Sequence, residues 1–224
     1  MVFDSIIFGY NDKNILNGIY LKIPKGSIVG LYGVNGSGKS TLLKIGCGYL
    51  KANDGNIFIN QESYYDKPRI KRFQKIAYLS QNSFLPPDLT IKKIILNSGL
   101  CEEVFFEDKL VKKLYKEKIK SLSVGELRYF EIKLLFALDR EYYLLDEPFS
   151  GIAPIMIEQI IELIKKSKTQ NKGILITEHY YRYVRQINDT SYILTNGKCH
   201  SVDPSNIDAE FLKLGYIAKP KEIT

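Results

Sequence analysis

Cysteine is scarce in this sequence, and long apolar runs are missing. Its three cysteines, Cys47, Cys101 and Cys199, are odd in number and lack the paired spacing of a metal site, which argues against a disulfide framework and a zinc centre. No segment approaches the ~18 consecutive apolar residues of a membrane-spanning helix, and residues 1–4 lack the basic start and apolar stretch of a signal peptide. We therefore expect a cytosolic protein that is soluble by itself and meets a membrane only through a partner.

The charge of the chain is positive but spread out. A net charge of +7 would suit contact with nucleic acid or with an anionic membrane surface. The basic residues are dispersed, however, over segments such as 112–120 and 165–166, which is typical of solvated helix faces, so no direct contact with nucleic acid is expected. With 224 residues, 45% of them hydrophobic, the chain suits one domain with a sizeable core.

Residues 33–41 match the phosphate-binding loop pattern G-x-x-x-x-G-K-[ST] at every fixed position. An apolar run at 27–32 predicts a strand before the loop, and 41–45 predicts the first turns of a helix after it. The glycines let backbone N–H groups turn inward, so the loop can bind a phosphate, with Lys39 on the β- and γ-phosphates and Ser40 on Mg²⁺. A loop that only turns the chain is the alternative, which the Lys-Ser pair in register disfavours. The predicted nucleotide-binding residues of the loop are Gly33, Asn35, Gly36, Ser37, Gly38, Lys39, Ser40 and Thr41.

Two acidic residues follow another apolar run. Residues 141–145 predict a buried strand that ends in Asp146 and Glu147. Asp146 is predicted to hold Mg²⁺ through its water shell, and Glu147 to polarise a water for attack on the γ-phosphate. Two acids facing solvent at a strand end are the alternative, and the phosphate loop earlier in the chain counts against it.

Strands and helices alternate along the chain, which indicates an α/β fold with active groups at the carboxyl ends of strands. Residues 1–24 predict two or three antiparallel strands. The segment 84–120 has apolar residues at helical spacing and predicts a small helical insertion. Further strands are predicted at 56–60, 75–80, 174–177 and 191–194, and further helices over 122–138, from 154 and over 208–214.

The order of these features resembles that of the ATP-binding cassette (ABC) ATPases. A phosphate loop, a glutamine after a strand, Leu-Ser-x-Gly-x at a helix start, a strand ending in Asp-Glu and a histidine after a later strand follow one another. The resemblance implies a phosphate-loop NTPase core of the ABC type, with an antiparallel β subdomain and a small inserted helical subdomain. It implies one ABC ATPase domain over 1–224, with a nucleotide-binding core at 1–83 and 121–224 and the helical insertion at 84–120.

Further residues take their roles from the resemblance. Tyr10 resembles the aromatic residue that stacks on adenine, with a plain strand-edge tyrosine as the alternative. Gln81 resembles the glutamine that meets Mg²⁺ and the attacking water, with a polar residue closing a strand as the alternative. His179 resembles the switch histidine that contacts the γ-phosphate and positions the water. The implied catalytic residues are Glu147, His179 and Gln81, and the implied metal ligands are Ser40, Gln81 and Asp146.

Ser123, Val124, Gly125 and Glu126 stand at the family's signature sequence. Ser-x-x-Glu is also a capping box, and the two interpretations are compatible because a helix N-terminus suits an anion. In the family the signature grips the γ-phosphate of ATP held by the other subunit, which implies a head-to-tail, two-fold dimer. Val124 replaces a usual glycine and Glu126 a usual glutamine, so we expect Val124 in ordinary helical geometry and Gly125 close to phosphate. Ala153 stands where many members have aspartate, which would weaken coupling between the two sites.

The resemblance implies the ATP-hydrolysing subunit of a bacterial ABC transporter, which binds ATP and Mg²⁺ and drives a separate transmembrane subunit. Its partner cassette would be a second copy, and its place the cytoplasmic inner face of the cell membrane. The segments 147–154 and 177–179 look most like the branch of lipopolysaccharide-export and branched-chain amino acid transporter ATPases. Two alternatives stay open: a non-transport cassette acting on nucleic acid or the ribosome, and a weakly hydrolysing regulatory cassette. The residues predicted to contact the membrane partner are Phe84, Leu85 and Leu89.

Overall fold

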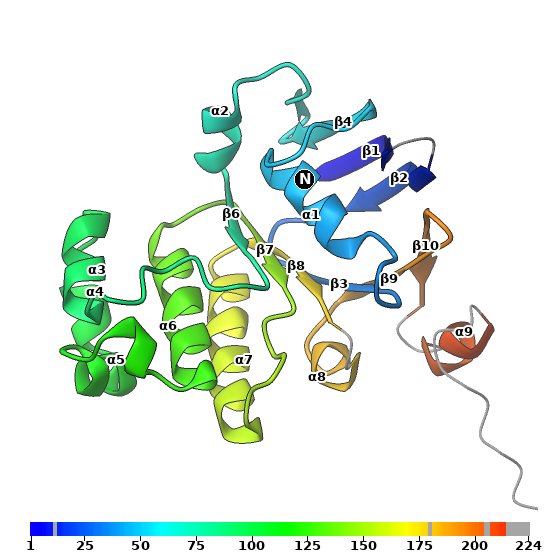
Figure 1. Ribbon diagram of the computed structural model, residues 1–224. Helices are drawn as coiled ribbons and strands as arrows, with labels where there is room; N and C mark the ends of the chain where they lie inside the picture. The colour runs from blue at the N-terminus through cyan, green and yellow to red at the C-terminus, as the bar shows by residue number, and fades with distance from the viewer. Residues whose placement is uncertain (11–12, 179–180, 204–206, 214–224) are drawn as a thin grey trace, which may run out of the picture.

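A computed structural model describes residues 1–10, 13–178, 181–203 and 207–213, whose strands form two sheets (Figure 1). The antiparallel sheet has the order β2-β1-β4-β5 and the larger sheet the order β10-β9-β3-β8-β7-β6. All strands of the larger sheet are parallel except β10, which pairs with β9 antiparallel. The strands are β1 (Val2–Tyr10), β2 (Lys13–Lys22), β3 (Ile28–Tyr32), β4 (Asp54–Ile59), β5 (Glu62–Ser63), β6 (Ile76–Leu79), β7 (Tyr142–Asp146), β8 (Gly173–Thr177), β9 (Thr190–Thr195) and β10 (Lys198–Val202).

Helices cover both faces of the larger sheet, with α1 on one face and α6, α7 and α8 on the other (Figure 1). The described helices are α1 (Lys39–Cys47), α2 (Arg69–Phe73), α3 (Ile91–Ser98), α4 (Glu103–Phe106), α5 (Lys109–Leu114), the 3₁₀ turn η1 (Ile119–Ser121), α6 (Val124–Ala137), α7 (Pro154–Thr169), α8 (Tyr181–Arg185) and α9 (Ile207–Lys213). Within the described residues, no helix is both long and apolar enough to span a bilayer.

Helix α1 is packed between the two sheets, and Gly46 makes this close packing possible. A Cβ added at Gly46 would lie 2.7 Å from Phe3 of β1 and 3.0 Å from Leu144 of β7. Any larger residue there would push one of these side chains away. Buried residues of α1, of the antiparallel sheet and of the larger sheet share one hydrophobic cluster. The antiparallel sheet therefore holds α1 in a fixed position on the larger sheet.

The second hydrophobic cluster lies on the opposite face, where α6 and α7 pack on the sheet. Helix α7 turns one apolar side toward the sheet, where Ile157, Ile160 and Ile164 are buried. Ile95 of α3 and Phe105 of α4 belong to the same cluster. The helices of the segment 84–120 therefore extend from α6 and share its core, while the division of the chain into core and insertion stays a prediction.

Most predicted elements are confirmed, and the differences are short. Residues 1–24 were predicted to hold two or three antiparallel strands, and they form two, of which β1 reaches Tyr10. Helix α2 and strand β5 were not predicted, because five and two residues are too short to show periodicity. Asn196 and Gly197 form the hairpin turn between β9 and β10, with φ of 49° and 70° as a tight turn requires, and the Asn-Gly pair is typical of such turns.

Candidate functional site

The phosphate loop leads from β3 directly into α1. Gly36 and Gly38 have φ of 78° and 106°, angles that glycine adopts without strain. Gly38 is also the N-cap of α1, and no side chain caps the helix, so its first N–H groups have no intrahelical partner. At Gly33 an added Cβ would lie 2.5 Å from the Ser37 hydroxyl. The loop is thus tightly folded and presents unpaired N–H groups, as an anion site requires.

A cavity of about 230 Å³ lies over this loop. Lys39 is buried there, and its Nζ donates to Gly33 O at 2.6 Å and to Val34 O at 3.2 Å. Burial lowers the pKa of Lys39, and the negative charge of Glu147 is the largest effect opposing it. The cavity is lined by Ile15, Asn35, Gly36, Ser37, Gly38, Lys39, Ser40, Thr41, Gln81 and Glu147.

Asp146 is buried at the end of β7 and accepts three hydroxyl hydrogen bonds. The donors are Ser40 Oγ at 3.1 Å, Tyr78 OH at 3.1 Å and Thr177 Oγ1 at 2.8 Å. Tyr78 and Thr177 come from β6 and β8, the two strands that flank β7. Burial, reinforced by the adjacent Asp146, raises the pKa of Tyr78, so this phenol keeps its proton and acts as a donor. The sheet therefore fixes the Asp146 carboxylate beside Ser40.

Glu147 and Gln81 meet at the cavity, although 66 positions separate them in the chain. Gln81 Nε2 donates to Glu147 Oε2 at 3.0 Å. Glu147 has a φ of 50°, an uncommon angle for a residue with a side chain, and its N–H donates to Thr177 O at 3.0 Å. The turn directly after β7 thus points Asp146 and Glu147 to different places, Asp146 toward Ser40 and Glu147 toward Gln81.

Two residues of α6 hold the Gln81 loop in place. Arg128 donates to Ser80 O at 2.8 Å and to Gln81 O at 2.5 Å, and it pairs with Glu131 at 3.1 Å. Glu131, 1% exposed, also accepts from Phe84 N at 3.3 Å. This pair was not predicted from the sequence. Its visible sign there is two opposite charges three positions apart within an apolar helix.

The signature residues form a complete capping box at the start of α6. Ser123 Oγ accepts from Glu126 N at 3.3 Å, and the Glu126 carboxylate accepts from Ser123 N at 2.9 Å, a bond that lowers the pKa of Glu126. Val124 takes ordinary helical geometry, as predicted, and is 62% exposed. Gly125 is buried against α7, where an added Cβ would lie 3.0 Å from Met156 Cγ, so packing gives it a structural reason to be glycine. Ser123 and its neighbours do not line the cavity of their own chain.

One predicted nucleotide-binding residue, Tyr10, is not brought into this cavity. Tyr10 is 57% exposed at the end of β1, where its ring contacts Phe8 edge-on at 4.8 Å, and it is absent from the cavity lining. Ile15 of β2 lines the cavity in its place, and the sequence analysis did not select it. His179 lies outside the described residues, so its role stays a prediction.

The site fits a triphosphate and Mg²⁺. Ser37 Oγ is buried in the loop without a hydrogen-bond partner in the described part of the chain, and a phosphate oxygen would satisfy it. The Ser40 hydroxyl and the Asp146 carboxylate are oxygen donors of the kind Mg²⁺ prefers. No group of three acidic, histidine or cysteine side chains in the described residues could hold a metal by itself. A magnesium ion here would therefore take further ligands from phosphate and water.

Comparison with known proteins agrees with this geometry. Residues 16–150 match the family model described as ABC transporter, which is more than half of the chain. The chain belongs to the ABC transporter ATP-binding family. Because the homologues in this family are ATPases, the chain is an ABC-type ATPase. Proteins of this family bind ATP.

Curated relatives extend the match over nearly the whole chain. An uncharacterised ABC transporter ATP-binding protein of Rhizobium meliloti is 31% identical, over 92% of this chain and 83% of its own length. The lipopolysaccharide export system ATP-binding protein LptB of Acidithiobacillus ferridurans is 29% identical over 87% and 86%. The branched-chain amino acid transport ATP-binding protein BraG of Pseudomonas aeruginosa is 29% identical over 88% and 89%. The lipopolysaccharide-export and branched-chain amino acid relatives carry the names of the branch that the sequence resembles, and all three matches agree with the ABC ATP-binding family.

Solved structures share the fold. The ATP-binding subunit of an ABC transporter superposes with a TM-score of 0.82 at 25% identity, over 96% of this chain and 98% of that one. A bacterial Atm1-family ABC exporter with ATP bound superposes with a TM-score of 0.83 at 20% identity, over 93% of this chain and 40% of the exporter. The predicted ABC-type α/β fold is thereby confirmed.

Proposed function

We propose that this chain is the nucleotide-binding subunit of a bacterial ABC transporter, which hydrolyses Mg-ATP and drives a separate transmembrane subunit from the cytoplasmic face of the membrane. The observation that supports this most is the meeting of Gln81 and Glu147 at the phosphate cavity. A glutamate placed there, with an amide donor to orient it, can take the proton of a water that attacks the γ-phosphate.

The residues of the cavity divide the work of the reaction. The loop N–H groups and Lys39 would bind the phosphates and neutralise the charge that develops on them. Ser40 and Asp146 would hold Mg²⁺, which supplies positive charge to the β- and γ-phosphates when bound. Glu147 would hold the water and accept its proton, while Gln81 fixes the carboxylate orientation. Tyr10 and His179 are proposed to stack on adenine and to contact the γ-phosphate.

The exposed signature supports a head-to-tail dimer. Ser123 and Val124 lie at the exposed N-terminus of α6 and take no part in the cavity of their own chain. A helix N-terminus attracts an anion, so this end can contact the γ-phosphate held by a second copy. ATP would then bind across the closed dimer and favour it, and hydrolysis would remove that contact. Two copies are needed because neither half-site is complete.

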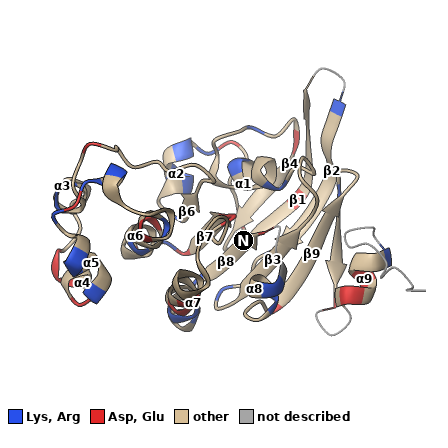
Figure 2. Ribbon diagram, turned by 60° about the horizontal axis from the view of Figure 1, so that its bottom comes forward, with Lys and Arg blue, Asp and Glu red and all other residues tan. Residues whose placement is uncertain are grey.

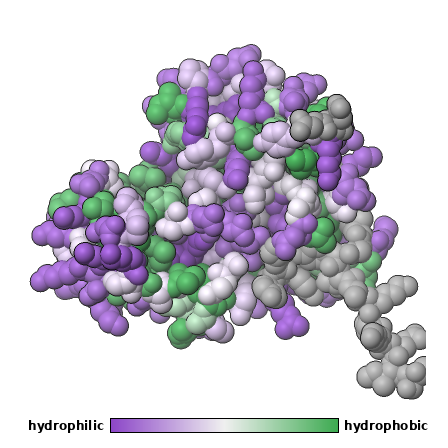
Figure 3. Space-filling model, viewed as in Figure 1, coloured by the Kyte–Doolittle hydropathy of each residue, from purple (hydrophilic) through white to green (hydrophobic). Residues whose placement is uncertain are grey.

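A groove beside the Gln81 loop is the proposed docking site for the transmembrane subunit. Its volume is about 560 Å³, and Figure 3 shows hydrophobic surface where the lobe of α3 meets the part that carries α2. Phe84 is 46% exposed and lines this groove, as its predicted role requires. Leu85 and Leu89 were wrong choices, because Leu85 is 9% exposed in the core and Leu89 packs against that core. The groove's large apolar lining residues are Tyr49, Leu50, Phe73, Ile76, Tyr78, Phe84, Leu135 and Leu138.

Two measurements test this proposal. The purified chain should hydrolyse Mg-ATP, and Glu147→Gln should keep ATP binding while the rate falls by about 10²–10⁴-fold. A tagged chain purified from membranes of its source cell should retain an integral membrane protein, and Phe84→Ala should release it. Equal turnover in the wild type and the Glu147 variant, or no membrane protein with the wild type, would contradict the corresponding half of the proposal.

A further inference from the structure

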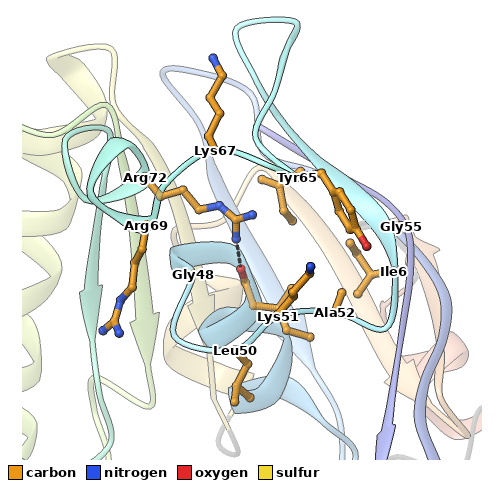
Figure 4. Close-up of a pocket in the computed structure, with 12 residues that line it drawn as sticks. Ile6, Gly48, Leu50, Lys51, Ala52, Gly55, Tyr65, Lys67, Arg69 and Arg72 are labelled. Atoms are coloured by element: carbon orange, nitrogen blue, oxygen red, sulfur yellow. Dashed lines mark hydrogen bonds between the residues drawn. The ribbon is translucent and has the colours of Figure 1, made fainter.

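A second cavity, of about 150 Å³, lies beside the docking groove and is lined by four cationic side chains and no carboxylate (Figure 4). It is bounded by the end of α1, strands β1 and β4, and α2. Figure 2 shows lysine and arginine concentrated on α2. Its floor is apolar, formed by residues such as Ile6, Ile45 and Ile57. The cationic residues are Lys51, Lys67, Arg69 and Arg72.

Arg72 is the residue that sets this cavity apart. It is 8% exposed, and its guanidinium donates to Ile45 O at 2.9 Å and to Tyr64 O at 2.6 Å. Its Nε has no hydrogen-bond partner, and no carboxylate of the described chain lies within ion-pair distance of it. Burial lowers the pKa of Arg72 because a buried guanidinium has little contact with water. Buried charges in proteins are normally paired, so this guanidinium lacks an anion.

Lys51 lines the same cavity as Arg72. Figure 4 shows the end of the Lys51 side chain directed toward the Tyr65 ring, whereas Lys67 and Arg69 extend outward. Lys51 Nζ lies 5.4 Å from the centre of the Tyr65 ring and has no carboxylate partner among the described residues, in contrast to Lys67, which pairs with Glu62. Lys51 and Arg72 are therefore two cations of one cavity that form no ion pair among the described residues, and the cavity's volume of about 150 Å³ has room for one small anionic group.

The cavity and the docking groove are neighbours that share a lining residue. Leu50 lines both of them. Arg69 lines the cavity and stacks on Tyr49 and Phe73 of the groove, at 4.0 Å and 4.7 Å from the ring centres. A segment that fills the groove with apolar side chains would thus lie next to the mouth of this cavity, on the side of Leu50 and Arg69.

We propose that this cavity receives an acidic side chain from the cytoplasmic segment of the transmembrane subunit, next to the apolar residues that the segment places in the groove. The site fits a carboxylate because the cavity is lined by cations without a carboxylate and has apolar lining residues that accept the aliphatic part of an aspartate or glutamate. The inference rests on the proposed function. It adds that the partner is recognised by charge as well as by apolar contact.

The test uses the complex of this chain with the membrane protein that co-purifies with it. Lys51→Glu reverses one exposed cation, and Lys198→Glu makes the same change on β10, outside both cavities. We expect Lys51→Glu to weaken the complex by about tenfold or more, and Lys198→Glu to leave it unchanged. Replacing the partner's acidic residue with lysine should restore binding to Lys51→Glu.

The outcomes separate this inference from the function beneath it. If Phe84→Ala releases the partner and Lys51→Glu does not, docking in the groove is supported and the contact between the cavity and an acidic side chain is refuted. If no membrane protein binds the wild type, the proposed transport function fails first. If Lys51→Glu leaves the complex intact but removes binding to phosphatidylglycerol vesicles, measured against phosphatidylcholine vesicles, the anion is a lipid phosphate and the inference is overturned.

Discussion

Replacing Arg128 with methionine removes a buried charge from α6 while keeping a long side chain. The change deletes the hydrogen bonds to Ser80 O and Gln81 O and leaves Glu131, 1% exposed, without its counter-ion. Removing one partner of a buried ion pair costs about 3–5 kcal/mol, because the other charge stays buried. For a chain of this length, each 1 kcal/mol lowers Tm by about 2–4 °C, so we expect a drop of about 6–20 °C.

The loss should depend on pH in a defined direction. Burial raises the pKa of Glu131, and Arg128 lowers it, so removal of Arg128 raises that pKa further. A carboxyl with a higher pKa in the folded than in the unfolded protein lowers stability as pH rises from the unfolded value to the folded one. The gap in Tm between Arg128→Met and the wild type should therefore widen as pH rises above about 4.3.

Thermal unfolding of three variants across pH tests this reasoning. Glu131→Gln in the Arg128→Met background removes the uncompensated charge and should recover most of the Tm. Glu162→Gln is the matched control, since it removes an exposed ion pair with Lys165 at the same i,i+3 spacing and should change Tm little. A double variant no more stable than Arg128→Met, or a gap that stays constant with pH, would refute the role of the buried pair.

Three further changes have expected outcomes. Ala153→Asp should stabilise the chain by about 1 kcal/mol, seen as a rise in Tm, because Ala153 is the N-cap of α7 and makes no side-chain cap. Tyr78→Phe removes one of three donors to buried Asp146, and should lower the free energy of unfolding in urea by about 1.5–3 kcal/mol, whereas a change near zero would mean the bond is not made. Val124→Gly should increase ATP-dependent dimerisation of the Glu147→Gln variant in size-exclusion chromatography, and no increase would mean that Val124 does not hinder the signature contact.

The parts of the site that were predicted from the sequence are those whose residues lie in one continuous segment of the chain. Residues 33–41 combine a strand end, a glycine turn and a helix start, so backbone conformation alone fixes the phosphate loop. The capping box at Ser123 and Glu126 is equally local. The position of Asp146 and Glu147 followed from the apolar strand before them.

The parts that escaped prediction depend on strand order. Tyr78 and Thr177 reach Asp146 only because β6 and β8 flank β7, and the sequence gives no register between these strands. Arg128 was overlooked for another reason: the apolar pattern of α6 suggested one buried face, whereas the helix is buried on several sides, including those of Arg128 and Glu131. Leu85 was misplaced because an exposed loop and a core edge look alike in sequence.

Helix α6 links three parts of the proposed mechanism without any flexible joint between them. Its first turn exposes the signature to a second subunit, and Glu131 lies eight positions from Ser123, about 12 Å along the helix. There the Arg128–Glu131 pair holds both ends of the short loop that presents Gln81 to Glu147 and Phe84 to the docking groove. A movement of α6 therefore shifts Gln81 and Phe84 together, because breaking the hydrogen bonds from Arg128 to Ser80 O and Gln81 O, or from Phe84 N to Glu131, would leave buried charged groups unsatisfied. Docking of the membrane subunit and closure of the dimer would in this way act on the same loop.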